Sequence, residues 1–367
     1  MGKNKIINVT KSFLPPLEEY SGYLKKIWDS NHLTNRGSFV TQLEEKLKNK
    51  FKVNHLTLTT NGTLPIQIAL KVLTKEASEI ITTPFSYIAT TSSIKWQKLT
   101  PVFVDIHPEY LTIDETKIEA AITSKTTAIL ATHVFGNPCN VLEIERISKK
   151  YNLKVIYDAA HCFDVNYKGK SIFNWGDVST CSFHATKIFH TGEGGCMISK
   201  DETIAKQLFL HHNFGHNGPY NFDSVGINAK MSELQAGLGL SMLKYFEEIK
   251  EKRKEIVGYY NKFLNFNGFR TQKLRPETEW NYHYYPLIFD SEKELLILLE
   301  KLNQINIYPR RYFYPSLNKV EYIDEGNIMP ISEDISSRIV CLPLYVGLSI
   351  DELNLIILNI NNRTNKL

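Results

Sequence analysis

Short apolar runs rich in β-branched residues alternate with segments of helical period between about residues 55 and 205. The runs are HLTLTT from His55, EIITTP from Glu79, TPVFVDI from Thr100, TAILATHVFG from Thr127, KVIYDAA from Lys154, VSTCSFHAT from Val178 and GCMIS from Gly195. The intervening segments place apolar residues three and four positions apart, as in Ile66, Ala69, Leu70 and Leu73. This alternation predicts an α/β layer whose mostly parallel sheet is covered by helices.

The pattern changes after about residue 232. Leu234, Leu238, Met242 and Ile249 recur at helical spacing and are followed by mixed charge, which predicts a long helix or a helix pair. Two further apolar runs, HYYPLIFD and VCLPLY, and two helical segments follow. We therefore predict a large α/β domain over residues 1–245 and a smaller α+β domain over residues 246–367. The N-terminal segment is a candidate to pack on the small domain.

Composition and charge narrow the class of protein. The 367 residues contain 43 Lys plus Arg and 39 Asp plus Glu, so the net charge is +4, and the basic residues are mostly interleaved with acids. This balance argues against a nucleic-acid partner. No apolar run approaches the roughly 20 residues needed to span a bilayer, and the N-terminus lacks the apolar core of a signal peptide. We expect a cytoplasmic protein without a membrane partner. The five scattered cysteines contain no C-x-x-C pair, which argues against a disulfide framework.

Candidate chemistry lies just after the predicted strands, because ligands of parallel sheets bind outside the carboxyl ends of the strands. Asn61, Gly62 and Thr63 follow the first run and open a helical segment, which favours an anion site; a simple capped helix start is the alternative. Asp158 ends the run from Lys154. A buried carboxylate there needs a donor or a cation, such as a protonated heterocyclic nitrogen, unless it merely caps the next turn.

Lys187 lies in the stretch SFHATKIFHTGEGG and is flanked by Phe183, Ile188 and Phe189. A desolvated lysine loses its proton more readily, as an amine must before it attacks an aldehyde; the alternative is a surface lysine with a buried stem. An anion site, a carboxylate and a lysine at three strand ends match the phosphate, ring nitrogen and aldehyde of pyridoxal phosphate. Lys187 is then the general base and acid, and Asp158 keeps the ring cationic.

Other side chains are candidates to contact the cofactor or a substrate. Tyr87 is our first choice to stack on the cofactor ring and Phe85 our second, although either could be a core aromatic. Arg310 and Arg311 have the chemistry to grip a nucleotide diphosphate, unless they are surface arginines. The substrate pocket also has two candidate lining residues that could equally be core polar groups, His133 and Tyr314.

Two alternative sites are rejected. His212 and His216 have the spacing of metal ligands on a helix, but Asn213 and Gly215 would interrupt that helix, so we predict no metal site. Cys162 is interpreted as a buried structural cysteine and not as a nucleophile.

Residues 157–198, YDAAHCFDVNYKGKSIFNWGDVSTCSFHATKIFHTGEGGCMI, resemble the DegT-type nucleotide-sugar aminotransferases, which are fold-type I enzymes that use pyridoxal phosphate. Further similar stretches are LTNRGSFVTQLEEKL from Leu33, TTNGTLPIQIAL from Thr59, PVFVDIHPEYLTID from Pro101 and GINAKMSELQAGLGL from Gly226. The resemblance implies a large domain with a mostly parallel seven-stranded sheet and a smaller C-terminal α+β domain.

The resemblance also implies a role for each matched residue. It assigns the cofactor's covalent anchor to Lys187, its ring nitrogen to Asp158, its 3-hydroxyl to His161 and its phosphate to Gly62, Thr63, Ser182 and, from the neighbouring subunit, Asn228. The last of these implies a homodimer with shared active sites.

The stretches TTPFSYIATTSS and RRYFYPSL are most similar to aminotransferases that form dTDP-4-amino-4,6-dideoxyglucose and to related 3-amino-sugar enzymes. The resemblance implies that L-glutamate donates its amino group to the 4-keto group of a dTDP-4-keto-6-deoxyhexose for O-antigen or other surface polysaccharide synthesis. A 3-keto sugar is the alternative substrate. A non-catalytic protein that binds the cofactor or a sugar nucleotide is the alternative from another class. A nicotinamide dehydrogenase is disfavoured because no G-x-G-x-x-G follows the first strand.

Overall fold

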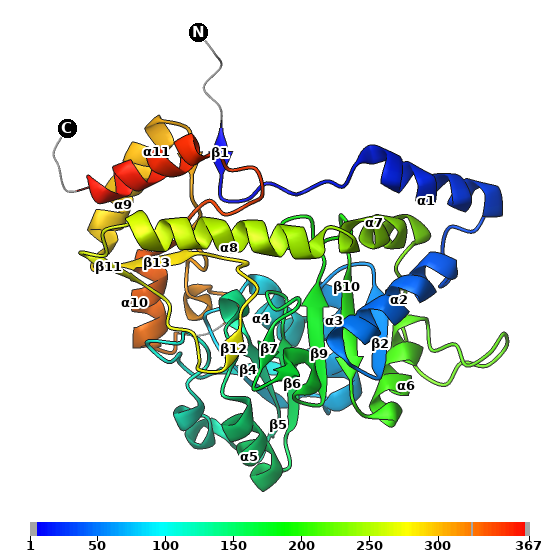
Figure 1. The fold of residues 1–367 in the computed structure, drawn as a ribbon. Coiled ribbons are helices and arrows are strands. Elements are labelled where there is room, and N and C mark those ends of the chain that lie inside the picture. Colours follow the sequence, from blue (N-terminus) through cyan, green and yellow to red (C-terminus); the bar gives the residue numbers. More distant parts are fainter. Residues whose placement is uncertain (1–5, 324–325, 364–367) are drawn as a thin grey trace.

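The computed structural model describes residues 6–323 and 326–363, so the ends of the two predicted domains lie outside the described residues. A seven-stranded sheet forms the centre of the larger part of the molecule (Figure 1). In spatial order its strands are β2 (His55–Thr59), β10 (Gly195–Ser199), β9 (Val178–Ser182), β6 (Lys154–Asp158), β5 (Thr126–Thr132), β3 (Glu79–Thr82) and β4 (Thr100–Phe103). Only β10 runs antiparallel to its neighbours in this sheet. The predicted mostly parallel seven-stranded sheet is confirmed, with one strand in each of the seven runs.

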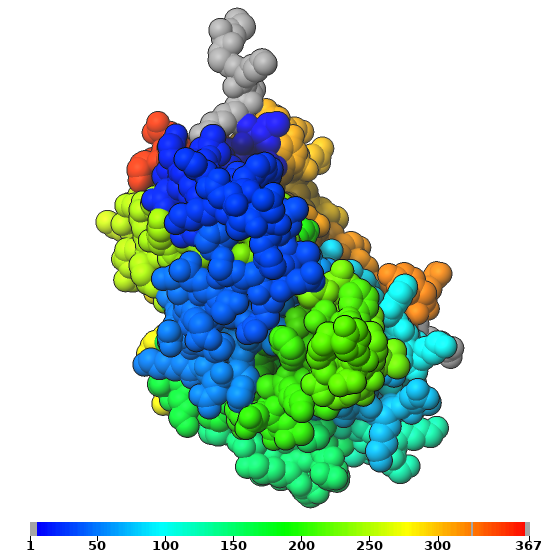
Figure 2. All heavy atoms as spheres, turned by 90° about the vertical axis from the view of Figure 1, so that its right-hand side faces the viewer, coloured from blue at the N-terminus to red at the C-terminus, as the bar shows by residue number. Residues whose placement is uncertain are grey.

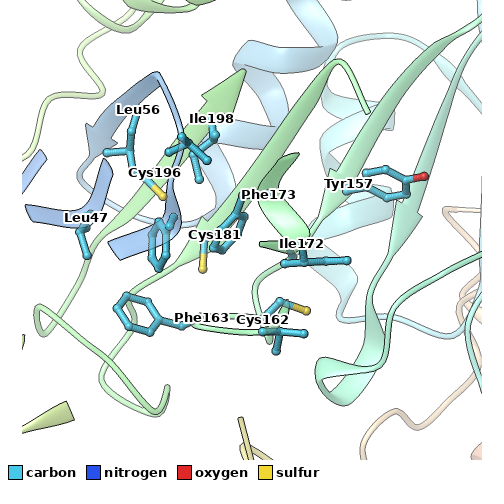
Figure 3. Packing of buried hydrophobic residues seen from close by; sticks show 14 of the residues in the cluster. Leu47, Leu56, Tyr157, Cys162, Phe163, Ile172, Phe173, Cys181, Cys196 and Ile198 are labelled. Carbon is cyan, nitrogen blue, oxygen red and sulfur yellow. The ribbon is translucent and has the colours of Figure 1, made fainter. Parts of the chain in front are cut away.

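Helices cover both faces of this sheet because its strands are apolar on both sides. On β6, Ile156 packs on one face, while Val155 and Tyr157 pack on the other. One face is covered by α3 (Thr63–Leu73), α4 (Ile88–Trp96) and α6 (Glu202–His212), and the other by α2 (Ser38–Phe51), α5 (Val141–Tyr151), α7 (Glu233–Leu243) and the start of α8 (Phe246–Phe263). Figure 3 shows the core of the second face, where Cys162 lies among Phe163, Ile172 and Cys181.

The C-terminal part contains a three-stranded antiparallel sheet of β11 (Phe269–Thr271), β13 (Pro286–Phe289) and β15 (Ile339–Cys341). Its helices are α9 (Glu292–Gln304), α10 (Pro330–Arg338) and α11 (Ile350–Asn361). Helix α11 starts at a capping box in which Ser349 and Glu352 satisfy each other's backbone amides, as a Ser-x-x-Glu sequence predicts. A second small sheet joins β12 (Thr278–Glu279) to β7 (Asn166–Tyr167) and β8 (Lys170–Ser171).

Helix α8 links the two parts. Phe246 and Ile249 at its start pack in the core of the large sheet, whereas Ile256 and Tyr260 pack with α9 and α11. The N-terminal strand β1 (Ile7–Asn8) pairs with β14 (Ile307–Tyr308), and α1 (Leu17–Ser30) then leads back to the large part. The division at residue 245 stays a prediction. Among the described helices, none combines the length and the apolar character needed to cross a membrane.

Candidate active site

A pocket of about 360 Å³ lies at the ends of β2, β5, β6 and β9. It brings together Lys187, Asp158 and His161 with the residues Gly62, Thr63 and Ser182. These six residues come from three separate strand ends, those of β2, β6 and β9, where the parallel sheet rule places ligands. Its size is typical of small-molecule sites. The sequence-predicted residues therefore meet in one cavity, together with Tyr87 and Arg310.

Asp158 ends β6 and is 5% exposed. Its Oδ2 accepts a hydrogen bond from Thr90 Oγ1 over 2.6 Å, and its Oδ1 accepts one from the amide of Ala160 over 3.1 Å. Burial raises the pKa of this carboxyl group, and the hydrogen bonds and the charge of Lys187 oppose that rise. A cation bound in the pocket would stabilise the carboxylate further.

Lys187 lies in the loop between β9 and β10, in a turn in which its amide binds the carbonyl of His184 over 2.8 Å. Burial lowers the pKa of its amine, while Asp158 opposes this shift. The amine therefore releases its proton at a lower pH than a solvent-exposed lysine does. Its Nζ donates a hydrogen bond to Tyr284 Oη over 3.3 Å.

The loop from β2 to α3 forms a close-fitting cradle. A Cβ added to Gly62 would lie 2.6 Å from Ser182 Cβ and 2.7 Å from Ser182 Oγ, so only glycine fits there without movement. Asn61 Oδ1 already binds the amides of Thr63 and Leu64. Asn61 thus satisfies two backbone amides at the helix start, as the alternative interpretation expects, while Thr63 and Ser182 line the pocket.

His161 lines the pocket, and a hydrogen bond from the backbone fixes the tautomer of its ring. Its Nδ1 accepts a hydrogen bond from the amide of Phe135 over 3.0 Å, so the ring proton of the neutral imidazole lies on Nε2. Burial lowers the pKa of His161 well below the usual range, which keeps the ring neutral. His161 can therefore donate a hydrogen bond to an oxygen of a ligand.

The two aromatic candidates lie in different places. Tyr87 lines the pocket and is 56% exposed, whereas Phe85 is fully buried and packs on Phe135 and Phe313. The geometry therefore favours Tyr87 as the residue that faces a bound ring. Phe85 is the core aromatic of the alternative interpretation.

The structure does not bring His133, Arg311 or Tyr314 to the pocket. His133 is buried, stacks on Tyr157 at 4.4 Å and accepts a hydrogen bond from the amide of Cys139 over 2.9 Å. Arg311 donates to Glu292 Oε1 over 2.7 Å and lies 3.6 Å from the centroid of the Tyr314 ring. These contacts support structural roles.

Asn228 is exposed and is not among the residues that line the pocket. Its backbone forms an isolated bridge with Asn213, and the next residue, Ala229, accepts a hydrogen bond from the amide of Thr60. The segment that carries Asn228 thus lies beside the end of β2. A role toward the neighbouring subunit stays a prediction.

Several pocket residues were missed by the sequence reasoning. Tyr284, Tyr312 and Phe313 come from the C-terminal part and also line the pocket. Thr90 supports Asp158 from α4. No strand-end signal marks them, although the aromatic stretch YHYY at residues 282–285 is visible in the sequence.

Residues 17–361 match the DegT/DnrJ/EryC1/StrS aminotransferase family. The dTDP-4-amino-4,6-dideoxy-D-glucose transaminase of Shigella dysenteriae is 38% identical over 96% of this chain and 98% of its own length. The GDP-perosamine synthase of Escherichia coli O157:H7 is 30% identical over 92% of this chain and 94% of its own. DesI, solved in the presence of its TDP-sugar product, superposes with a TM-score of 0.93 at 26% identity, covering 99% of this chain and 94% of that chain. The chain belongs to the DegT/DnrJ/EryC1/StrS aminotransferase family.

Proposed function

We propose that this aminotransferase uses pyridoxal phosphate to move the amino group of L-glutamate to the 4-keto group of a dTDP-4-keto-6-deoxyhexose. The product is dTDP-4-amino-4,6-dideoxyglucose, a precursor for O-antigen or another surface polysaccharide. The main support is the 38% identity, over nearly the whole chain, to the Shigella dysenteriae transaminase. A second support is that Lys187 and Asp158 line the same pocket.

The pocket fits the cofactor of this family. Asp158 is a buried carboxylate whose raised pKa marks a site that lacks a full positive partner, and the protonated ring nitrogen supplies one. Gly62 leaves room beside Ser182 that a side chain would fill. We assign the phosphate to Thr63 and Ser182, the ring hydroxyl to His161 Nε2 and one ring face to Tyr87.

The chemistry of the site follows from the charges that these residues hold. Bound pyridoxal phosphate supplies an electron sink that makes the C–H bond beside the substrate nitrogen acidic. Asp158 maintains the positive charge of the ring nitrogen, and its hydrogen bonds from Thr90 and Ala160 favour the ionised carboxylate against the effect of burial. Lys187, whose amine loses its proton readily, takes the proton from one carbon and returns it to another.

Arg310 lines the pocket on the side of the C-terminal part, together with Tyr312 and Tyr284. Its guanidinium lies 5.1 Å from the centroid of the Tyr312 ring. We assign Arg310 to the diphosphate of the sugar nucleotide, because a guanidinium matches paired phosphate oxygens. The candidate role of Arg311 in the same contact is not retained in this proposal.

The proposed assembly is a homodimer with shared active sites. One face carries α1 and α2 beside α6 and the loop that follows it (Figure 2). Large apolar side chains on these segments are exposed, among them Leu17, Trp28, Tyr220, Phe222 and Val225. Exposed apolar side chains of this size are consistent with a protein interface, and the loop leads to Asn228. The cytoplasmic location stays a prediction.

The function is tested by supplying L-glutamate with the 3-keto and 4-keto dTDP sugars in parallel and identifying the aminated product. We expect amination of the 4-keto sugar. Amination of the 3-keto sugar alone would replace the proposed substrate with its alternative. A protein that remains colourless with added cofactor and aminates neither sugar would be the non-catalytic binder.

A further inference from the structure

Tyr284 is the side chain that holds the amine of Lys187 among the described residues. The amine donates to Tyr284 Oη over 3.3 Å, and the two residues lie 97 positions apart in the sequence. Lys187 comes from the loop between β9 and β10, whereas Tyr284 lies shortly before β13, which starts at Pro286. The hydrogen bond therefore ties the reactive nitrogen to the C-terminal part of the molecule.

The ring of Tyr284 is fixed from several sides. Ring centroids lie 4.7 Å away for His161, 4.2 Å for His283, 5.5 Å for Phe135 and 5.5 Å for Tyr312. The backbone before it is held by Arg253 of α8, which donates to the carbonyl of Tyr282 over 2.9 Å and to that of His283. Packing of this kind restricts the phenol oxygen to one position.

The pKa shifts of Tyr284 and Lys187 determine the protonation states of the two groups in this hydrogen bond. Burial raises the pKa of Tyr284, so the phenol stays neutral at the pH at which enzymes work. Burial lowers the pKa of the Lys187 amine. A neutral oxygen that accepts a hydrogen bond stabilises an ammonium group more than an amine, so Tyr284 partly opposes the effect of burial on Lys187.

We propose that Tyr284 is a positioning residue that aims the free amine of Lys187 at the reacting carbons during amino transfer. This inference rests on the proposed function. A lysine side chain has several rotatable bonds, and proton transfer requires a donor and an acceptor near hydrogen-bond distance. The hydrogen bond to the phenol oxygen restricts rotation of the Lys187 side chain and holds its nitrogen in place.

The proton balance leaves Tyr284 unchanged. With pyridoxal phosphate bound, Lys187 Nζ would take the proton from the α-carbon of glutamate and deliver it to the former aldehyde carbon of the cofactor. The sugar half-reaction runs in the opposite sense. Tyr284 accepts an N–H hydrogen bond from Nζ in both directions and neither gains nor loses a proton.

The test compares Tyr284→Phe with the matched control Tyr285→Phe. Tyr285 is also buried, but its Oη donates a hydrogen bond over 2.6 Å to Oδ1 of Asn261, an exposed residue of α8. The first readout is the rate at which pyridoxal phosphate attaches to the full-length protein stripped of cofactor, measured against pH. Only the neutral amine attacks, so in Tyr284→Phe the inflection of this profile should move about one pH unit lower. Tyr285→Phe should keep the wild-type profile.

The second readout is the single-turnover rate of the loaded enzyme with L-glutamate and with α-deuterated L-glutamate. In Tyr284→Phe this rate should fall roughly 10- to 100-fold, with an isotope effect at least as large as in the wild type. Faster cofactor attachment at neutral pH combined with slower turnover is a signature that general loosening of the fold does not produce. Tyr284→Leu, checked by its unfolding midpoint, replaces the phenylalanine variant if that variant does not fold.

An unshifted attachment profile, an unchanged single-turnover rate or a lost isotope effect in the Tyr284 variant that folds would overturn the positioning role. None of these results would contradict the proposed function, provided that the wild-type enzyme loaded with cofactor accepts the amino group of L-glutamate. A wild type that fails this exchange would refute the proposed function itself.

Discussion

Thr90 Oγ1 on α4 donates a hydrogen bond to Asp158 Oδ2 at the end of β6, over 2.6 Å. Behind it stands a row of hydroxyls, because Thr132 Oγ1 donates to Ser86 Oγ over 3.1 Å and Ser86 Oγ lies 2.7 Å from Thr90 Oγ1. With each hydroxyl donating to the next, the row points toward the carboxylate. Such a chain favours the ionised form of Asp158.

Thr90→Val should therefore raise the pKa of Asp158 further and weaken its hold on the ring nitrogen. We expect turnover to fall about 10-fold, since a hydrogen bond to a charged group is worth roughly 1.5–3 kcal/mol. Thr91→Val is the control, because the buried Thr91 hydroxyl has no hydrogen-bond partner within the described part of the chain. Steady-state rates of both variants test this, and equal losses in both would contradict it.

Asp158→Asn should change how stability depends on pH in the cofactor-free protein. Burial raises the pKa of Asp158 in the folded state, so the folded protein binds a proton at this group more tightly than the unfolded chain does. This proton binding stabilises the folded protein, and the stabilisation is fully present below the ordinary pKa of aspartate. That contribution is lost as the pH rises through the higher, folded-state pKa. The variant has no such group to titrate.

The difference in unfolding midpoint, wild type minus variant, should thus become more positive as the pH falls from 7 to 4. Acid effects of the other residues are common to both proteins and cancel in this difference. Thermal unfolding across that range measures it. A difference that stays constant or shrinks toward acid pH would mean that Asp158 is not held at a raised pKa.

Gly62→Ala should weaken cofactor binding, because the new Cβ would lie 2.6 Å from Ser182 Cβ. Overpacking of this kind costs about 1–3 kcal/mol, so we expect the Kd of pyridoxal phosphate to rise roughly 5- to 100-fold. Gly258→Ala on the exposed side of α8 is the control, since nothing lies within 4 Å of its added Cβ. An unchanged Kd in Gly62→Ala would remove the phosphate cradle from the account.

Arg310 and Arg311 are adjacent but should respond to mutation in opposite ways. Arg310→Ala removes a side chain that lines the pocket, and we expect the KM for the sugar nucleotide to rise about 10-fold with little change in the unfolding midpoint. Arg311→Ala removes the partner of Glu292 and Tyr314 and should lower the midpoint with the KM unchanged. The reverse result would restore Arg311 as the substrate contact.

The alternation of apolar runs and helical segments predicted the sheet, and the ends of its strands supplied most of the candidates that line the pocket. The candidate His133 lies outside the pocket for a geometric reason. Successive residues along a strand point to opposite faces. At the end of β5, Thr132 lines the pocket, while the next residue, His133, points away and stacks on Tyr157. Alternation alone does not say which of the two faces the ligand.

Contacts between distant segments were outside the reach of the sequence. Tyr284 meets Lys187 only because the C-terminal part folds over the strand ends, and Thr90 meets Asp158 because α4 begins beside them. Neither residue has a local signature, since a tyrosine before a strand and a threonine in a helix are ordinary. The pairing of β1 with β14 likewise depends on the tertiary fold.

The most direct test of the account asks where the cofactor is attached. The purified enzyme is treated with borohydride to make any cofactor linkage permanent, digested, and mapped by mass spectrometry. We predict that the cofactor mass lies on the peptide that contains Lys187 and is absent from the same peptide of Lys187→Ala, which should bind the cofactor but not transaminate. A cofactor fixed to a different lysine of the wild type, or to none, would contradict the central claim.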